Sequence, residues 1–312
     1  MDLKKNKAAN ADGNLLERIE AVRQERQRQN LEKLLGELNE MIGLDQVKNE
    51  INSLVNLIEI TRMRSEKGLP SMDMSYHMVF TGNPGTGKTT IARLVAGIYK
   101  ELGVLSAGTL TETDRAGLVA GFVGQTALKV KDVCKKASGG VLFIDEAYSL
   151  TQSTSSSDFG LEAVDTLVKE MEDNRGNLVV IAAGYTNEMR RFISANTGLM
   201  SRFNKIIEFP DYSEEELIDI LRLMAKRAGY QLTAEAVMVI RCYVEEMTPN
   251  EARDFGNARG IRNLFERMVT NQANRLMSQK GVRSVKALTF ITRDDAMLAV
   301  KENIASHGWN LL

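Results

Sequence analysis

A glycine-rich stretch carries the residues whose types and spacing are best suited to chemistry. Residues 82–90 read Gly-Asn-Pro-Gly-Thr-Gly-Lys-Thr-Thr and fit the pattern G-x-x-x-x-G-K-[ST]. Such a loop turns successive backbone N–H groups toward a phosphate chain, and the following helix adds the positive end of its dipole. Lys88 would reach the β- and γ-phosphates, and the Thr89 hydroxyl would ligate the Mg²⁺ that bridges them. The stretch therefore predicts a nucleotide site built from Gly82, Asn83, Pro84, Gly85, Thr86, Gly87, Lys88, Thr89 and Thr90.

The residues on either side give this loop the setting that a phosphate loop needs. A strand-like run at 78–81 precedes it, and Ile91, Leu94, Val95 and Ile98 recur after it at helical spacing. A surface turn that matches the pattern by chance is the alternative, and it would not require these two flanking elements. The sequence therefore favours a phosphate loop between a strand and a helix.

Two carboxylates supply what hydrolysis needs beyond nucleotide binding. Residues 141–144 (Val-Leu-Phe-Ile) predict a buried strand, and Asp145 and Glu146 follow at its carboxyl end, where open α/β sheets bind their ligands. Asp145 would ligate the Mg²⁺ directly or hydrogen-bond to the groups that ligate it, and Glu146 would orient and deprotonate the attacking water. The alternative is that both acids cap a helix starting at Ala147. The phosphate loop upstream favours the hydrolytic interpretation.

Alternating strands and helices must position these groups. Strand-like runs are predicted at 78–81, 109–113, 140–144, 178–182 and 205–209, with helical stretches between them. This alternation predicts a parallel sheet with helices on both faces. After Pro210 and Asp211 the pattern becomes helical, with N-cap signals at Ser213, Thr233 and Thr292.

The chain divides by these patterns into three predicted parts: a polar extension and helix over 1–30, an α/β nucleotide-binding domain over 31–211, and a helical domain over 212–312. Residues 1–13 are predicted to be a disordered lead, and Asn14 with Glu17 signals the start of a largely polar helix. We expect that helix to lie in solvent or to face a partner. Ser153–Ser157 is a low-complexity patch.

Composition excludes several classes of function. Forty Lys and Arg residues against 41 Asp and Glu residues leave a net charge of -1, so no global field attracts nucleic acid or an anionic membrane. Cys134 and Cys242 lack metal-ligand spacing, which disfavours zinc and haem chemistry. No apolar run is long enough for a membrane helix. We expect a cytoplasmic protein with reduced thiols.

Several stretches together resemble the AAA+ ATPases, in the branch that contains stage V sporulation protein K and the red-type (CbbX/CfxQ-like) Rubisco activases. Besides the loop and the Asp-Glu pair, they are 114–126 (DRAGLVAGFVGQT), 182–185 (AAGY), 198–203 (GLMSRF), 209–213 (FPDYS) and 257–263 (NARGIRN). The resemblance covers nearly everything after the N-terminal helix. It implies a P-loop NTPase fold, with a five-stranded parallel sheet sandwiched by helices and followed by a small all-helical lid domain. It also implies hydrolysis of Mg-ATP to ADP and phosphate.

The resemblance implies roles for two arginines. Arg202 matches the arginine finger, which reaches the site of a neighbouring subunit, where a planar cation would stabilise charge on the transferred phosphoryl group. Arg259 matches the sensor 2 arginine of the lid, with Arg262 as the next candidate. Each has a plainer alternative, because Arg202 could pair with an acid such as Glu208 and Arg259 could lie on a solvated helix face.

Two further positions are less sharply defined. The general AAA+ pattern ends the fourth strand with an Asn as sensor 1, whereas this chain has Ala-Gly-Tyr there, so Tyr185, Thr186 or Asn187 could contact the water. Ile42 and Gly43 resemble the segment that lines the adenine pocket, although a turn between helices explains them as well.

A candidate pore loop completes the set. Phe122, Val123 and Gly124, preceded by Gly121, match the aromatic-hydrophobic-glycine loop of the family. An exposed aromatic flanked by glycines can grip any extended peptide, whereas a buried Phe122 would be an ordinary core residue. Asp158-Phe159-Gly160 is a weaker candidate for a second pore loop.

The combined hypothesis is an ATP-driven remodelling machine. We expect a nucleotide-dependent homo-hexamer that pulls segments of an unidentified client protein through its pore, with ATP and Mg²⁺ as the bound groups and without membrane insertion. The alternatives are an ATP-dependent switch or scaffold without threading, a DNA-acting ATPase and a small-molecule kinase. The branch does not separate Rubisco activation from sporulation or secretion, and client choice is expected in the polar N-terminal helix.

Overall fold

The computed structural model describes residues 2–70, 74–122, 124–152, 158–247, 249–278 and 284–307. By its internal contacts the chain divides into two units. Unit 1 comprises Met1–Met41, Asp45–Phe80 and Thr89–Ile207. Unit 2 comprises Ile42–Leu44, Thr81–Lys88 and Glu208–Leu312, so it combines two short internal segments with the C-terminal third of the chain.

A five-stranded sheet has the order β2-β3-β4-β1-β5. Its strands are β1 (Met78–Gly82), β2 (Leu110–Thr113), β3 (Val141–Ile144), β4 (Val179–Gly184) and β5 (Lys205–Phe209). β2, β3 and β4 pair in parallel, and every residue of β1, β3 and β4 is buried. Continuous burial of this kind is typical of parallel strands covered on both faces. All five predicted strands are confirmed, with ends shifted by at most two residues.

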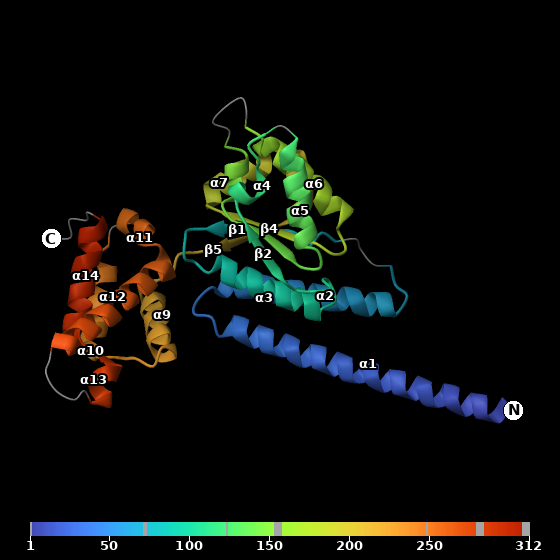
Figure 1. Ribbon diagram of the computed structural model, residues 1–312, viewed down its shortest axis with the longest axis horizontal. Coiled ribbons are helices and arrows are strands. Elements are labelled where there is room, and N and C mark those ends of the chain that lie inside the picture. The colour runs from blue at the N-terminus through green and yellow to red at the C-terminus, as the bar shows by residue number, and fades with distance from the viewer. Residues whose placement is uncertain are drawn as a thin grey trace. The chain divides into compact units, whose positions relative to one another are not determined.

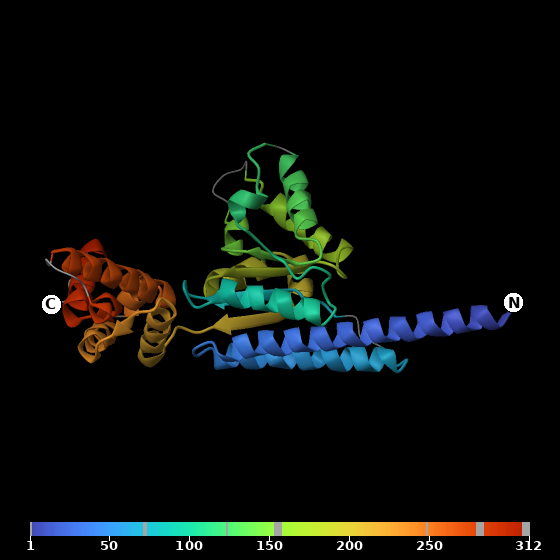
Figure 2. The same ribbon diagram turned by 60° about the horizontal axis from the view of Figure 1, so that its bottom comes forward.

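Helices cover both faces of this sheet (Figures 1 and 2). In chain order they are α1 (Asp2–Asn39), α2 (Asp45–Glu66), α3 (Lys88–Glu101), α4 (Arg115–Leu118), α5 (Gln125–Lys136), η1 (Ala147–Leu150), α6 (Gly160–Asp173), α7 (Thr186–Ser194) and α8 (Thr197–Arg202). One core cluster packs α5, α6, α7 and α8 against alternate residues of β3 and β4, including Leu142, Ile144, Val180 and Ala182. In both views α1 runs beside α2 on the opposite side of the sheet from α5 and α6.

The first helix differs from expectation. A disordered lead was expected over residues 1–13, but the backbone is helical without interruption from Asp2 to Asn39. The lead contains several alanines and lysines and no proline, so its intrinsic helix propensity is sufficient. The C-terminal part of α1 packs on the unit through Leu31 and Leu38, whereas Val22 is 70% exposed. The N-terminal part therefore projects beyond the body of the unit (Figure 1).

Unit 2 is mainly helical. Its helices are α9 (Glu214–Arg227), α10 (Ala234–Glu245), α11 (Pro249–Phe255), α12 (Asn257–Ser278), α13 (Val285–Thr289) and α14 (Arg293–His307). Two of the predicted caps are present: Ser213 forms a capping box with Glu216, and Thr233 accepts a hydrogen bond from the Ala236 N–H. At the third, Thr292 donates its N–H and its hydroxyl to the Asp295 carboxylate. The structure adds a short parallel pair, β6 (Gln231–Leu232) with β7 (Phe290–Ile291). Two-residue strands are too short to show an alternating pattern, so the sequence did not predict them.

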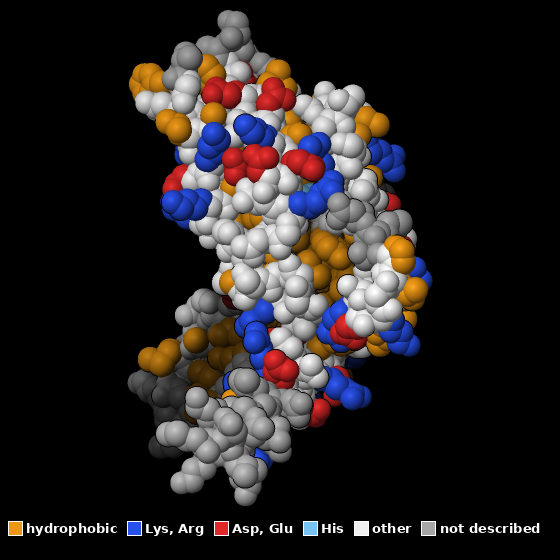
Figure 3. Space-filling view, turned by 90° about the vertical axis from the view of Figure 1, so that its right-hand side faces the viewer, with side chains coloured by type: hydrophobic (Ala, Val, Ile, Leu, Met, Phe, Trp, Pro, Cys, Tyr) orange, Lys and Arg blue, Asp and Glu red, His pale blue; other side chains and the backbone are white. Residues whose placement is uncertain are grey.

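Two surface properties bear on partners. No helix in the described ranges combines the length and the apolar character that crossing a membrane requires. On the face shown in Figure 3, Lys and Arg side chains lie intermixed with Asp and Glu side chains. The described residues visible on that face therefore form no continuous basic stripe.

Candidate functional site

Residues 82–88 of the phosphate loop lie in unit 2, and the loop depends on its glycines. Gly85 has a φ of +73°, and a Cβ added there would lie 2.1 Å from the Gly256 carbonyl oxygen and 2.9 Å from the Arg259 nitrogen. Gly82 has a φ of +145°, and its Cβ would lie 2.3 Å from the Phe209 carbonyl oxygen. Any side chain at either position would force the surrounding backbone apart. The loop therefore keeps both the conformation and the close approach that an anion-binding backbone needs.

A lysine and a threonine of the loop donate side-chain hydrogen bonds to its backbone. Lys88 Nζ donates to the carbonyl oxygens of Gly82 and Asn83, at 2.8 Å in each case. The hydroxyl of Thr86, a buried residue, donates to the same Asn83 oxygen at 2.8 Å. These bonds keep a positive charge at the loop, which fits the binding of a phosphate chain.

A polar clamp ties the loop to the segments after β5. Asp211 accepts two hydrogen bonds from Asn83 Nδ2, at 3.0 and 2.8 Å, and one from Asn257 Nδ2 at 2.8 Å. Asn257 also donates to the Pro84 carbonyl at 3.2 Å and accepts from the Tyr212 N–H at 3.0 Å. Its φ of +54° is one that asparagine tolerates better than most residues. Asn257 thus joins the loop, the exit of β5 and the start of α12.

Asn257 is a site residue that sequence reasoning missed. It lies in the stretch 257–263, in which only the arginines were assigned roles from the sequence. The one local feature that singles out Asn257 is its position directly after Gly256. The next residues carry the predicted lid arginine. The Ala258 N–H donates to the Gly85 carbonyl at 3.3 Å, and Arg259 follows in the first turn of α12 with its side chain exposed. The structure therefore places Arg259 beside the phosphate loop.

The proposed adenine segment also belongs to unit 2. Gly43 has a φ of +61°, and a Cβ there would lie 2.1 Å from Glu216 Oε1 and 3.4 Å from the Tyr212 ring. Ile42 packs against the hydrophobic core of the same unit. Burial, followed by the charge of Glu216, raises the pKa of Tyr212 to about 12, and its hydroxyl donates to the Thr86 carbonyl at 3.4 Å. Ile42 and Gly43 therefore lie against the residues that support the phosphate loop.

The two carboxylates lie at the end of β3 in unit 1, and both are exposed. The Asp145 carboxylate accepts the Glu146 N–H at 3.1 Å. Glu146 has a φ of +48°, a left-handed conformation that costs a non-glycine residue about 1–3 kcal/mol and is concentrated at functional sites. The backbone thus turns sharply where the predicted base stands.

Tyr148 is a second residue that sequence reasoning did not single out. It lies in η1 just after the acids, and its ring centroid is 5.9 Å from that of Tyr185. A Cβ on Gly184 would lie 2.6 Å from the Tyr148 ring, which explains the glycine at this strand end. Burial, followed by the charge of Glu146, raises the pKa of Tyr148 to about 12, so its hydroxyl stays protonated. Tyr185 itself is extended (φ -68°, ψ 143°) and precedes α7.

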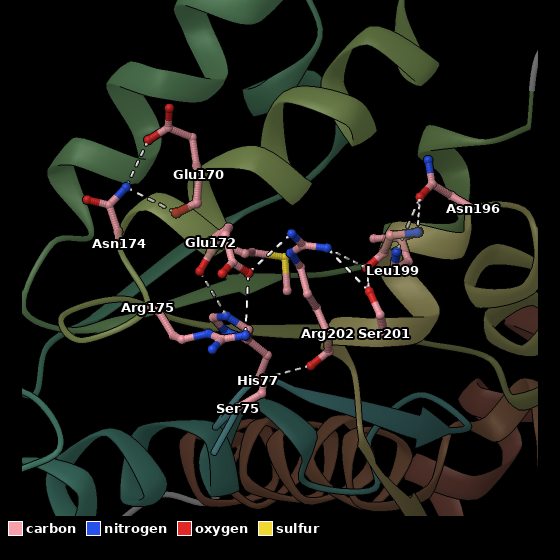
Figure 4. Close-up of polar contacts among 12 residues, drawn as sticks. Ser75, His77, Glu170, Glu172, Asn174, Arg175, Asn196, Leu199, Ser201 and Arg202 are labelled. Atoms are coloured by element: carbon pink, nitrogen blue, oxygen red, sulfur yellow. Dashed lines mark hydrogen bonds and ion pairs between the residues drawn. The ribbon is translucent and has the colours of Figure 1, made fainter. Parts of the chain in front are cut away.

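Arg202 is the last residue of α8 (Figure 4). From the sequence, the alternative to a finger role for Arg202 was an ion pair with an acid such as Glu208. In the structure its guanidinium instead pairs with the carboxylate of Glu172, at 3.2 Å. The backbone carbonyl of Arg202 accepts a 2.7 Å hydrogen bond from the Ser75 hydroxyl. Arg202 is therefore held from two sides within unit 1.

The candidate pore residues are surface residues as far as they are described. Phe122 is 73% exposed, so it is not part of the core, and Gly124 caps α5 with a φ of +77°. Val123 lies outside the described residues. Asp158, at the predicted second loop, pairs with Arg115 at 2.5 Å. The segments that lead into the two loops are therefore tied together.

Oxygen donors suit the metal that the loop pattern predicts. Within the described ranges, no cluster of three His, Cys, Asp or Glu residues forms a metal site by itself. Mg²⁺ does not need one, because it binds through one or two protein oxygens together with water and substrate phosphates. The hydroxyl of Thr89 and the exposed carboxylate of Asp145 are hard donors of the required kind.

Sheet order, phosphate loop and helical unit together define a P-loop nucleotide-binding protein. Residues 78–211 match the family described as "ATPase family associated with various cellular activities (AAA)", and residues 213–306 match the AAA lid domain. Stage V sporulation protein K of Bacillus subtilis (strain 168) is 41% identical over 273 residues, which cover 87% of this chain and 84% of that protein. The chloroplastic ribulose bisphosphate carboxylase/oxygenase activase of Cyanidioschyzon merolae is 42% identical over 257 residues, which cover 82% and 87%.

The chain therefore belongs to the AAA family of ATPases, in the branch of these two relatives. A solved RuvB mutant from Thermotoga maritima superposes with a TM-score of 0.58 at 22% identity, covering 88% of this chain and 75% of that one. At this identity the likeness shows the fold alone. The predicted family, fold class and ATPase activity are thereby confirmed.

Proposed function

We propose that this ATPase is a ring-forming motor, a homo-hexamer that assembles with nucleotide and pulls segments of a client protein through a central pore. The observation that carries the proposal is the direct bonding of the phosphate loop to the start of α12. Asn257 donates to the Pro84 carbonyl, and the Ala258 N–H donates to that of Gly85. A loop that closes on phosphate would alter these bonds, so the nucleotide state would be transmitted to the lid helix.

Within one protomer the groups divide the work on ATP. The loop amides and Lys88 hold the phosphates, and Thr89 and Asp145 supply oxygens for the Mg²⁺ that neutralises phosphate charge. Glu146 orients the attacking water and takes its proton. Arg259 approaches from the lid helix and contacts the γ-phosphate. The sequence division at 30/31 and 211/212 is kept in this proposal, and the second boundary is supported by family matches that end at 211 and begin at 213.

Tyr185 is the proposed sensor 1 residue, with Thr186 and Asn187 as the other options. The contact between the rings of Tyr148 and Tyr185 supports the choice of Tyr185, because it holds that side chain beside the turn that carries Glu146. Tyr148, protonated throughout the neutral range, adds a second hydroxyl at this turn. These phenols would position water near the base.

A neighbouring protomer supplies the remaining cation. Arg202 has a planar fork of donors that matches phosphate oxygens, and such an arginine stabilises charge in phosphoryl transfer. We propose that it acts on the site of the next protomer, so that an isolated protomer hydrolyses ATP slowly. Such head-to-tail contacts form a closed ring when the rotation between neighbours brings the last protomer back to the first, and a ring is the arrangement that we propose.

Phe122 is the proposed grip on the client. A phenylalanine that is 73% exposed beside Gly121 can contact any extended peptide through apolar surface. Because this contact reads no particular sequence, client choice would fall to other parts, and the projecting end of α1 is the proposed place. Rubisco activation, sporulation and secretion remain the candidate pathways.

Three other functions are weaker. A DNA-acting ATPase would need a basic path for the phosphate backbone, whereas the net charge is -1 and the charges in Figure 3 are intermixed. A small-molecule kinase would need an acceptor pocket and a lid carrying several arginines that act on phosphate. The lid of this chain carries a single motif of that kind, around Arg259. A switch or scaffold without threading would use the same site, and it is the alternative if no client stimulates turnover.

A mixing experiment tests the shared site. Glu146→Gln protein and Arg202→Ala protein should each turn over ATP very slowly. An equal mixture should regain about one quarter of the wild-type rate, because a random head-to-tail ring pairs an intact Glu146 with an intact Arg202 at about one site in four. Brisk turnover by Arg202→Ala protein alone, or a silent mixture of two assembled variants, would refute the proposal.

A further inference from the structure

The guanidinium of Arg202 is bonded inward (Figure 4). Its Nη2 lies 3.2 Å from Glu172 Oε2, and its Nη1 donates to the Gly198 carbonyl and to the Ser201 hydroxyl, both at 3.3 Å. Its Nε is buried and has no hydrogen-bond partner among the described residues. Only 22% of the side chain is exposed. The donor fork is therefore largely occupied by groups of its own protomer.

The surrounding groups make Glu172 the anion that matters here. Across the described ranges, Glu172 is the carboxylate with which Arg202 pairs, and the same oxygen also meets Arg175 Nη2 at 3.4 Å. His77 offers no charge, because its Nδ1 accepts the Val180 N–H at 2.9 Å and a neutral ring is required for that bond. One carboxylate is thus shared by two guanidiniums.

We propose that Glu172 is a holding residue, which sets how readily Arg202 becomes available to a neighbouring protomer. The inference rests on the proposed action of Arg202 in the next site. Phosphate oxygens compete for the same Nη donors that now meet Glu172, so engagement exchanges one anion for the other. The pair with Glu172 therefore opposes assembly on ATP, and releasing it favours the assembled state.

The size of the effect follows from exposure. Glu172 is 46% exposed and Arg202 is 22% exposed, so the pair is neither fully solvated nor buried. Half-exposed ion pairs change an equilibrium by about two- to fivefold. Because each interface in a ring carries one such pair, a variant without the carboxylate should shift assembly at least about twofold.

The experiment measures ATP turnover per protomer against protein concentration. Glu172→Gln, which removes the charge and keeps the shape, should lower the concentration that gives half-maximal turnover at least about twofold, without lowering the plateau. Glu170→Gln is the matched control. Glu170 is on the same helix and accepts from Asn174 Nδ2 at 3.0 Å, and it should leave the half-maximal concentration unchanged.

A second measurement separates holding from chemistry. Sedimentation velocity with the slowly hydrolysed analogue ATPγS should show a larger assembled fraction for Glu172→Gln than for wild type. Adding Glu172→Gln to Arg202→Ala should not change the assembled fraction further, because the guanidinium that Glu172 holds is then absent. Arg175→Gln, which removes the guanidinium that shares Glu172 with Arg202, should raise the half-maximal concentration.

Three results would overturn the inference: an unchanged half-maximal concentration in Glu172→Gln, a lower plateau in that variant, or a fall in Arg175→Gln. A lower plateau would mean that Glu172 aids the reaction instead of holding the arginine back. Failure of the proposed function itself is distinguishable, because then Arg202→Ala alone would keep wild-type turnover and its concentration dependence.

Discussion

His77 makes the stability of unit 1 depend on pH. The residue is 3% exposed, with Nδ1 accepting the Val180 N–H and Nε2 lying 3.4 Å from the Met171 carbonyl oxygen. Burial is the largest cause that lowers the pKa of His77 from 6.5 to about 4. The Met171 carbonyl opposes the change, and the charges of Arg175 and Arg202 add to it.

The sign and size follow from proton linkage. The unfolded chain takes up a proton near pH 6.5, whereas the folded chain does so only near pH 4. Between these values the unfolded state binds more protons, so the free energy of unfolding falls as the pH falls. The stabilisation is fully present above pH 6.5, and the gap, at 1.36 kcal/mol for each pKa unit, amounts to about 3 kcal/mol.

Urea unfolding followed by circular dichroism tests this in wild type and in His77→Asn. The asparagine oxygen can accept the Val180 N–H but does not titrate. The variant should be less stable near neutral pH, and its deficit should shrink by about 2 kcal/mol by a pH of about 4.5. Hydrogen exchange at the Val180 amide assigns the effect to unit 1. Parallel stability curves for the two proteins would refute the reasoning, since every other acid-sensitive group is common to both.

Three further changes test the loop, the lid and the pore. Gly85→Ala should weaken ATP binding at least about tenfold in a fluorescent-nucleotide titration, because its Cβ would meet a carbonyl oxygen at 2.1 Å. Gly68→Ala has a similar φ and nothing within 4 Å, and it should bind normally; equal affinities would contradict the clash. Asp295→Asn should lower the free energy of unfolding of unit 2 by about 2–3 kcal/mol in urea, since this 2% exposed carboxylate accepts two 2.9 Å bonds from Arg275; a negligible loss would contradict that estimate. Phe122→Ala should spare most of the basal ATPase and abolish client remodelling, and unchanged remodelling would remove the threading hypothesis.

The sequence was most informative where local pattern and chemistry coincide. The glycine loop, the strand that ends just before Asp145 and the cap at Ser213 each occupy a few adjacent residues, so their spacing was enough to place them. The same was true of β3 and β4, whose apolar runs are bounded by turns.

Contacts between distant segments could not be predicted in this way. Nothing near Arg202 in the sequence indicates Glu172, which lies 30 positions earlier on another helix. Asn257 is separated from Pro84 by 173 positions, and its clamp arises only when both segments meet in unit 2. The glycine before Tyr185 is likewise explained only by the ring of Tyr148. Such pairs are set by the tertiary fold, which short-range spacing does not encode.

The scattered make-up of unit 2 also affects how the protein is made. Its glycine loop leaves the ribosome long before the segment that carries Asp211 and Asn257. At usual rates of synthesis, the interval between Lys88 and Asn257 lasts on the order of ten to thirty seconds. A nascent chain therefore carries the triphosphate-binding loop without its bracing partners, and the site matures only after the segment with Asn257 has been made.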